Sequence, residues 1–214
     1  MMNTPATSGK EIEIKLDLGS FTNYLKLLGF LGQPEREEHQ RNVFFDTAER
    51  SLGKKGWALR VRVENDCGRI TLKGAKTHQS GAAVRDEIEA EISRTLACQI
   101  AGLEADLMAL EHEPVVKARE LIGKKAVKPV VQFQNLRMKK AMRLEDYEYT
   151  FEVDKTEFPD GSVDYELELE LPDVSRIEWV NTRLQRIMSS LNIPFEPQPE
   201  SKLARALKRS GNAL

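Results

Sequence analysis

Charged and apolar residues alternate along several segments of this 214-residue chain, and this alternation constrains the fold more than any other feature. Successive side chains of a strand point to opposite faces, so Glu11, Glu13 and Lys15 share one face while Ile12 and Ile14 share the other. Further strands are predicted at 41–46, 58–64, 69–73, 84–93, 130–137, 139–144, 147–158 and 162–171. The pattern is typical of an antiparallel sheet with one charged face and one apolar face.

Helical spacing of apolar residues interrupts the strands in three places. Ser20 precedes a predicted helix that ends near 29–32, and a longer helix is predicted over 175–191. Between them, the segment 96–125 is predicted as a helical insert. Pro114 divides this insert into two pieces, because proline interrupts the hydrogen bonds of a helix interior.

The sequence predicts one domain, which spans residues 10–210. Residues 1–9 are mostly small and polar and are expected to form a disordered tail, while the segment 201–208 is expected to close the ordered chain. No apolar run approaches the roughly 18 residues of a membrane span, so no membrane is expected as a partner. Cys67 and Cys98 lack the spacing of a zinc site or a disulfide framework, and we therefore expect a cytoplasmic localisation.

Charge is unusually abundant but balanced. The chain has 32 Lys and Arg against 34 Asp and Glu, so no overall positive field attracts nucleic acid, which is not expected as a partner. Like charges nevertheless stack on single strand faces, as in Glu166, Glu168 and Glu170, and in Arg60 and Arg62. Stacked like charges repel one another. A solvated sheet face is the simpler interpretation, whereas a closed sheet would turn every charged face toward one shared interior.

The clustered acidic residues suit binding of a metal cation, and the clustered basic residues suit binding of a phosphate group. Clustered carboxylates supply the oxygen ligands that hard divalent cations prefer. Clustered arginines and lysines supply the donors that phosphate oxygens need. Together they predict metal-assisted phosphoryl chemistry, with an anion-binding wall and a separate metal-binding wall if the sheet closes into a barrel.

The segment Glu11–Lys15 resembles the ExExK motif of the CYTH superfamily, the triphosphate tunnel metalloenzymes. Later segments support the resemblance by their order and spacing: 45–47, 58–62, 71–74, 85–89, Arg137, Asp154, 158–161, 166–170 and 201–202. The match spans about 11–207. It implies an α+β fold, in which an eight-stranded antiparallel β-barrel forms a triphosphate tunnel and helices pack on the outside.

The resemblance also implies roles for individual residues. The expected metal ligands are Glu11, Glu13, Asp154, Glu166 and Glu168. The residues expected to bind the triphosphate are Lys15, Arg60, Arg62, Lys73, Arg85, Arg137 and Lys202. Lys15 and Glu168 are expected to be catalytic, and the cofactor is expected to be Mg²⁺ or Mn²⁺.

The implied activity is hydrolysis of a small-molecule triphosphate, with inorganic tripolyphosphate as the first candidate and phosphate and pyrophosphate as products. Class IV adenylyl cyclase, thiamine triphosphatase and RNA triphosphatase activities occur in the same superfamily. Trp57 is an aromatic candidate for stacking on an organic ring, although a packing role explains it more simply. A non-catalytic polyphosphate- or nucleotide-binding module is the alternative of another class. The protein is expected to be a monomer or a homodimer.

Overall fold

The computed structural model describes residues 7–123, 125–145 and 147–211. The strands are β1 (Thr7–Asp17), β2 (Arg36–Asp46), β3 (Ala58–Val63), β4 (Cys67–Lys73), β5 (Thr77–Gln79), β6 (Ala82–Ser93), β7 (Lys128–Leu144), β8 (Tyr147–Glu157), β9 (Val163–Glu170) and β10 (Glu196–Pro197). The helices are α1 (Phe21–Leu31), α2 (Ser51–Lys54), α3 (Arg94–Ala101), α4 (Glu113–Ile122), α5 (Ile177–Ser190) and α6 (Lys202–Arg209), with short 3-10 turns at η1 (Leu107–Ala109) and η2 (Val174–Arg176).

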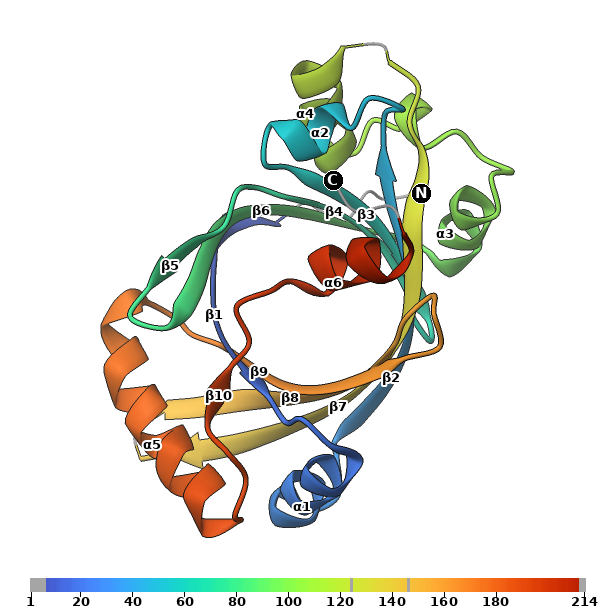
Figure 1. Ribbon diagram of the computed structural model, residues 1–214. Helices are drawn as coiled ribbons and strands as arrows, with labels where there is room; N and C mark the ends of the chain where they lie inside the picture. The colour runs from blue at the N-terminus through green and yellow to red at the C-terminus, as the bar shows by residue number, and fades with distance from the viewer. Residues whose placement is uncertain (1–6, 124, 146, 212–214) are drawn as a thin grey trace.

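Eight of the strands close into an antiparallel barrel. Their order is β1-β9-β8-β7-β2-β3-β4-β6, and β6 pairs with β1 to complete the ring (Figure 1). In the closing pair Glu11 lies opposite Arg85, while on the other edge of β1 Lys15 lies opposite Glu168. The short strands β5 and β10 extend β6 and β1 outside the ring. The predicted eight-stranded barrel is confirmed.

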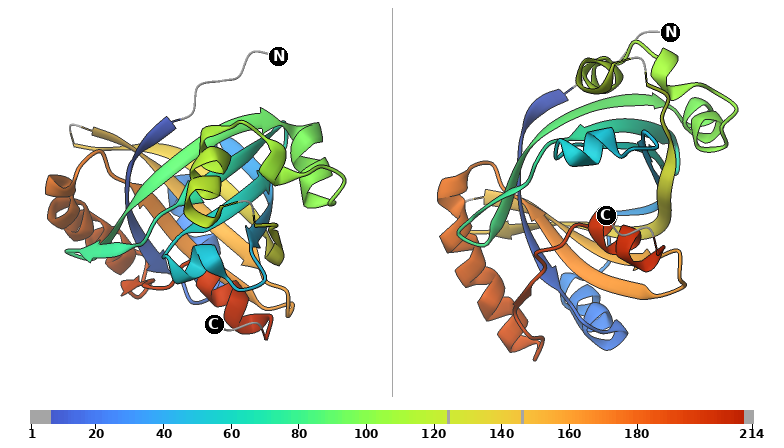
Figure 2. Two further views of the ribbon diagram at one scale, coloured as in Figure 1. Left: turned by 90° about the horizontal axis from the view of Figure 1, so that it is seen from above. Right: turned by 45° about the horizontal axis from the view of Figure 1, so that its top comes forward.

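The hydrophobic core lies outside the barrel wall, because the apolar faces of the strands point outward. One cluster packs α1 and α5 against β1, β8 and β9, and includes Leu27 and Leu184. A second cluster packs α2, α3 and α4 against β2, β3 and β4, and includes Leu52 and Ile100. The two sets of helices lie on opposite sides of the barrel (Figure 2). Apolar burial of this kind, worth roughly 25 cal/mol per Å², leaves the inner faces free for charged side chains.

Helices α1–α5 pack on the outside of the barrel, as predicted. Helix α6 instead lies across one end of the barrel (Figure 1). Its Ala206 and Leu207 pack on Phe44, Phe133 and Phe158. Phe44 and Phe133 belong to the inward faces of β2 and β7, where the alternation places an aromatic ring in line with the polar tunnel residues. An apolar plug therefore narrows the tunnel at this end.

Some element boundaries differ from the sequence-based expectation. The expectation of a disordered tail over residues 1–9 is wrong for Thr7–Gly9, because these residues pair with β6. The rest of the expected tail lies outside the described residues. Strand β2 begins at Arg36, whereas the sequence predicts a start at residue 41. Strand β7 is continuous from Lys128 to Leu144, whereas the sequence predicts two strands, 130–137 and 139–144. Proline 114 lies in the first turn of α4, where a missing N–H costs little. None of the described helices is both long enough and apolar enough to cross a membrane.

Candidate active site

The inward faces of the strands bring the predicted site residues into one tunnel. They surround a cavity of about 650 Å³. The predicted residues in its wall are Glu11, Glu13, Lys15, Arg60, Arg62, Lys73, Arg85, Arg137, Glu168 and Lys202. Asp154 and Glu166 are fully buried beside Glu168. The fold thus gathers the predicted set at one place, while the role of each residue stays a prediction.

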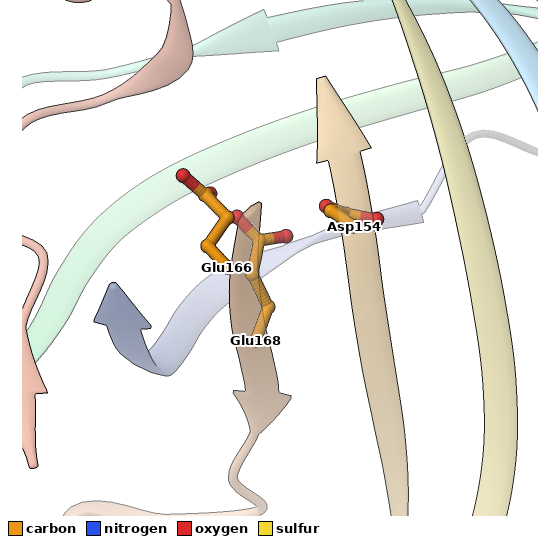
Figure 3. Close-up of side chains that lie close together, drawn as sticks. All are labelled: Asp154, Glu166 and Glu168. Carbon is orange, nitrogen blue, oxygen red and sulfur yellow. The ribbon is translucent and has the colours of Figure 1, made fainter. Parts of the chain in front are cut away.

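Three carboxylates meet where β8 and β9 lie side by side. Asp154 is the register partner of Glu166, and Glu168 follows on the same face of β9. Figure 3 shows the two glutamates on one strand and Asp154 on its neighbour. One oxygen from each residue lies within 4.8 Å of the others. Buried carboxylate oxygens are the donors that Mg²⁺ and Mn²⁺ prefer, so this donor set fits a hard divalent cation.

Lys202, the first residue of α6, places its ammonium group among these carboxylates. Its Nζ lies 2.8 Å from Asp154 Oδ2 and 2.9 Å from Glu168 Oε1, and it also contacts Glu166. The position is set by Ser201, which caps α6 by accepting a backbone hydrogen bond from the first turn. Burial opposes the charge, but Asp154 and Glu166 raise the pKa of Lys202 above its usual range. The ammonium group is therefore charged at neutral pH.

Arg137 joins the same carboxylates from β7. Its Nε donates to Asp154 Oδ1 at 2.8 Å and its Nη2 donates to Asp154 Oδ2 at 2.6 Å, which makes a two-point pair. It also contacts Glu152 and Glu168. Burial opposes ionisation of Asp154, but Arg137 and Lys202 lower its pKa below its usual range. Asp154 is therefore ionised and is held in place by basic side chains of the chain itself.

Glu11 and Glu13 are held by basic side chains of neighbouring strands. Lys73 Nζ donates to Glu11 Oε1 at 2.8 Å, and Arg85 Nε donates to Glu11 Oε2 at 2.5 Å. Arg85 Nη2 also donates to Glu13 Oε1 at 3.0 Å. Burial opposes ionisation of Glu11, but Lys73 and Arg85 lower its pKa below its usual range. Neither carboxylate belongs to the group formed by Asp154, Glu166 and Glu168, and Glu13 is connected to that group through Lys15.

Arg60 and Arg62 project from β3 and have fewer acidic partners than the basic residues described above, with one ion pair each. Arg60 Nη2 donates to Thr71 Oγ1 at 3.1 Å, while its buried Nε–H has no hydrogen-bond partner among the described residues. Arg62 Nε donates to Asn42 at 3.1 Å and its Nη1 contacts Glu64 at 3.2 Å. Burial and then the charge of Arg62 lower the pKa of Arg60 to about 10. Arg60 is thus a charged donor with spare capacity for an anion.

The expected separation into two walls is wrong. Lys15 Nζ lies 3.3 Å from Glu13 and 2.6 Å from Glu168, so a cation sits between two of the predicted metal ligands. Lys202 and Arg137 are interleaved in the same way. A buried charge is costly unless an opposite charge lies close to it. Basic and acidic groups therefore alternate through the tunnel.

The sequence-based set omits several charged side chains of the tunnel, namely Glu38, Glu64, Arg69, Lys139 and Glu152. It also omits Arg205, which contacts the buried Glu166. Glu38 precedes the predicted start of its strand, and Lys139 follows a predicted break that the structure does not have. Arg69 and Glu152 lie within predicted strands on the charged face, so strict alternation could have found them. Arg205 carries no strand signal, because it lies on α6.

A closed eight-stranded barrel with a charged interior is the architecture of the triphosphate tunnel proteins. The family model described as the CYTH domain matches residues 9–206, and the chain belongs to this family. Its members include triphosphatases and cyclases, its fold binds small-molecule triphosphates, and its tunnel enzymes depend on metal. The resemblance of the ExExK segment is thereby confirmed at the level of the family.

Solved structures of similar proteins align with nearly the whole length of this chain. A candidate adenylyl cyclase from Hippeastrum, described as having a dominant triphosphatase activity, is 26% identical with a TM-score of 0.81, over 95% of this chain and 97% of that one. A candidate adenylate cyclase from Bacillus halodurans is 26% identical with a TM-score of 0.70, over 92% and 98%. A Pyrococcus horikoshii protein at 20% identity and a TM-score of 0.60, over 93% and 99%, shares the fold. No curated protein matches the chain.

Proposed function

We propose that this chain hydrolyses inorganic tripolyphosphate to phosphate and pyrophosphate, with Mg²⁺ or Mn²⁺ as cofactor. The observation that carries the proposal is that Arg60, a buried and charged hydrogen-bond donor, lines the same cavity as the carboxylate of Glu168. Anion donors and carboxylates in one enclosed space suit a substrate that is itself a metal-bound polyanion. The triphosphatase activity described for the Hippeastrum relative supports the same choice.

In this proposal the basic side chains of the tunnel hold the triphosphate. They are Lys15, Arg60, Arg62, Lys73, Arg85, Arg137 and Lys202. The carboxylates that would hold the metal are Asp154, Glu166 and Glu168, joined by Glu11 and Glu13 of the ExExK segment from the tunnel wall. A bound divalent cation would neutralise phosphate oxygens and lower the pKa of a coordinated water. The fixed arginines and lysines stabilise the charge of the transition state without any covalent intermediate.

Lys15 and Glu168 have the central catalytic roles in this proposal. Burial opposes ionisation of Glu168, but Lys15 and Lys202 lower its pKa well below its usual range. Such a carboxylate is a weak base, so we assign it the orientation of the attacking water rather than full removal of a proton. Lys15, 2.6 Å away, would hold Glu168 in place and present its positive charge to the phosphate.

An organic triphosphate is the second candidate, because one end of the cavity is apolar. Trp57, Phe44 and Leu203 contribute to its wall there, and such surfaces suit a nucleobase or a thiamine ring. The test is a panel of tripolyphosphate, ATP and thiamine triphosphate with each metal, assayed for phosphate, pyrophosphate and cyclic AMP. Fastest turnover of tripolyphosphate supports the first candidate. Dominant cyclic AMP and pyrophosphate from ATP would replace it with a cyclase.

A binding module without turnover is the alternative of another class. An anion binder gains nothing from the buried carboxylates Glu13 and Glu168 unless a metal is present. The variant Glu13→Ala tests the metal mechanism, since hydrolysis should fall while the basic residues remain. Hydrolysis that persists unchanged with added Mg²⁺ would contradict it. We also infer that the barrel and its helices, from Thr7 to about residue 210, form one domain, which acts in the cytoplasm as a monomer or a homodimer.

A further inference from the structure

The ammonium group of Lys202 occupies the space between the three carboxylates that would hold a metal. It contacts Asp154 Oδ2 at 2.8 Å and Glu168 Oε1 at 2.9 Å, together with Glu166 Oε1. The three side chains are buried, Asp154 and Glu166 completely. Without a nearby cation, such a group of carboxylates would repel one another in a medium of low dielectric. Lys202 therefore does locally what a divalent cation would do.

Lys202 is the one basic residue among those described that contacts all three carboxylates. Two of the oxygens that it contacts have a second basic partner, since Arg137 Nη2 donates to Asp154 Oδ2 at 2.6 Å and Lys15 Nζ lies 2.6 Å from Glu168 Oε1. Arg137 binds Asp154 Oδ1 and Glu168 Oε2. Arg205 binds Glu166 Oε2. A metal coordinated by all three residues would therefore lie where the ammonium group of Lys202 lies, within 2.9 Å of an oxygen of each carboxylate. Two cations cannot occupy one position and repel strongly at such short range, so Lys202 has to move away.

The side chain of Lys202 can leave while helix α6 stays in place. Arg205 Nη1 pairs with Asp164 at 2.6 Å, and Arg209 pairs with the same carboxylate at 2.9 Å. The guanidinium group of Arg209 also lies 4.2 Å from the ring centroid of Phe158. Four methylene groups separate the ammonium of Lys202 from its anchored backbone. A rotation of this side chain is enough to move the ammonium into the cavity that Lys202 already lines.

We propose that Lys202 is an internal counter-cation of the metal site, which the divalent metal displaces and which then becomes available to a phosphate oxygen of the substrate. Metal loading and substrate binding are thereby coupled through one side chain. The coupling also explains how three buried carboxylates are tolerated by the metal-free chain. It rests on the metal site of the proposed function but not on the identity of the triphosphate.

The test measures metal binding without substrate. Isothermal titration calorimetry with MnCl₂ would compare the wild type with Lys202→Met, which removes the charge and keeps the length of the side chain. The variant is expected to bind Mn²⁺ about tenfold more tightly or better, because no cation has to be displaced. Lys208→Met is the matched control on the same helix, since Lys208 is exposed and pairs with Glu200, and it should bind as the wild type does.

Equal or weaker Mn²⁺ binding by Lys202→Met would overturn this inference and leave the proposed hydrolysis untouched. Absence of Mn²⁺ binding in every variant would overturn both. Failure of tripolyphosphate turnover, with tighter binding by Lys202→Met, would overturn only the proposed function. A crystal structure of the wild type grown with Mn²⁺ tests the same point without a variant. An anomalous peak between Asp154 and Glu166, with Lys202 still contacting both, would contradict the displacement.

Discussion

Lys15 and Glu168 face each other as register partners of β1 and β9, and Lys15 Nζ lies 2.6 Å from the Glu168 carboxylate. Both side chains are almost fully excluded from solvent, at 7% and 8% exposure. This pair joins the strand that carries the ExExK segment to the strand that carries the glutamate stack. The ExExK segment and the glutamate stack thus meet through a lysine, which keeps the site compact.

Replacing this lysine should reduce turnover strongly. Lys15→Met is expected to lower kcat for tripolyphosphate by about 100-fold or more, which is typical for the loss of one buried group that stabilises transition-state charge. Steady-state phosphate release measures the effect. Lys10→Met is the matched control, since Lys10 is exposed on the same strand and should leave kcat unchanged. Similar rates for the two variants would contradict the catalytic role of Lys15.

Glu64 is expected to act through the arginines that it holds. It is buried and lies 3.2 Å from Arg62 Nη1 and 3.1 Å from Arg69 Nε. Burial opposes its ionisation, but Arg62 and Arg69 lower the pKa of Glu64 to about 2. Glu64→Gln should raise KM for tripolyphosphate roughly tenfold with a smaller change in kcat, since a charge-assisted hydrogen bond that positions Arg62 is lost.

Glu91→Gln is the control for this effect, because Glu91 is more exposed and contacts Arg69 alone among the arginines of the tunnel that the structure describes. Its KM should stay close to that of the wild type. A fall in kcat at constant KM in Glu64→Gln would show that the residue does more than position arginines.

Glu170 should make stability depend on pH in the opposite direction from an ordinary paired carboxylate. Partial desolvation, then the charges of Glu152 and Glu11, raise the pKa of Glu170 to about 7 from 4.5. Because the folded-state pKa lies above the unfolded value, its stabilising contribution is complete below about pH 4.5 and is lost as pH rises through 7. Glu170→Gln should therefore raise Tm at pH 8 and leave it unchanged at pH 4.5.

Differential scanning calorimetry at both pH values measures this difference, and Glu196→Gln at an exposed position of β10 serves as the control. A gain in Tm that is the same at pH 4.5 and pH 8 would contradict the assigned titration.

Phe158 should be important for holding α6 in the barrel. Its ring packs on Phe133 at 5.7 Å between centroids and lies under the guanidinium group of Arg209. Phe158→Ala is expected to lower the free energy of unfolding by about 3–5 kcal/mol, as for other buried phenylalanines. Urea denaturation measures the loss, and Phe158→Leu should lose less. A loss below about 1 kcal/mol would show that α6 does not depend on this contact.

The sequence predicts the barrel strands well, because alternation is a direct consequence of strand geometry. Glu11, Glu13 and Lys15 point inward as the pattern requires, and so do Arg60 and Arg62. The pairing of β1 with β6 that closes the ring has no such local signal, since either strand could end a sheet. The charged strand faces favour a closed sheet and the family resemblance implies one, but neither predicts which two strands meet.

The sequence predicts many of the charged residues that share the tunnel, but it does not predict how they pair. Which carboxylate pairs with which cation depends on strand register, and a strand pattern does not specify its partner. The interleaving of Lys15 between Glu13 and Glu168 is therefore visible only in the structure. The apolar plug is a similar case, because Phe44 follows the polar inward positions of β2 and packs against a helix distant in sequence.

The most direct test of metal-dependent triphosphate hydrolysis is turnover of tripolyphosphate in ¹⁸O-labelled water. With Mg²⁺, phosphate and pyrophosphate should form in equal amounts, and each turnover should place one ¹⁸O atom in a product, because water attacks a phosphorus atom of the substrate. Addition of EDTA should stop the reaction. Failure of the wild-type protein to release labelled product with either Mg²⁺ or Mn²⁺, or release that continues unchanged in EDTA, would contradict the proposed hydrolysis.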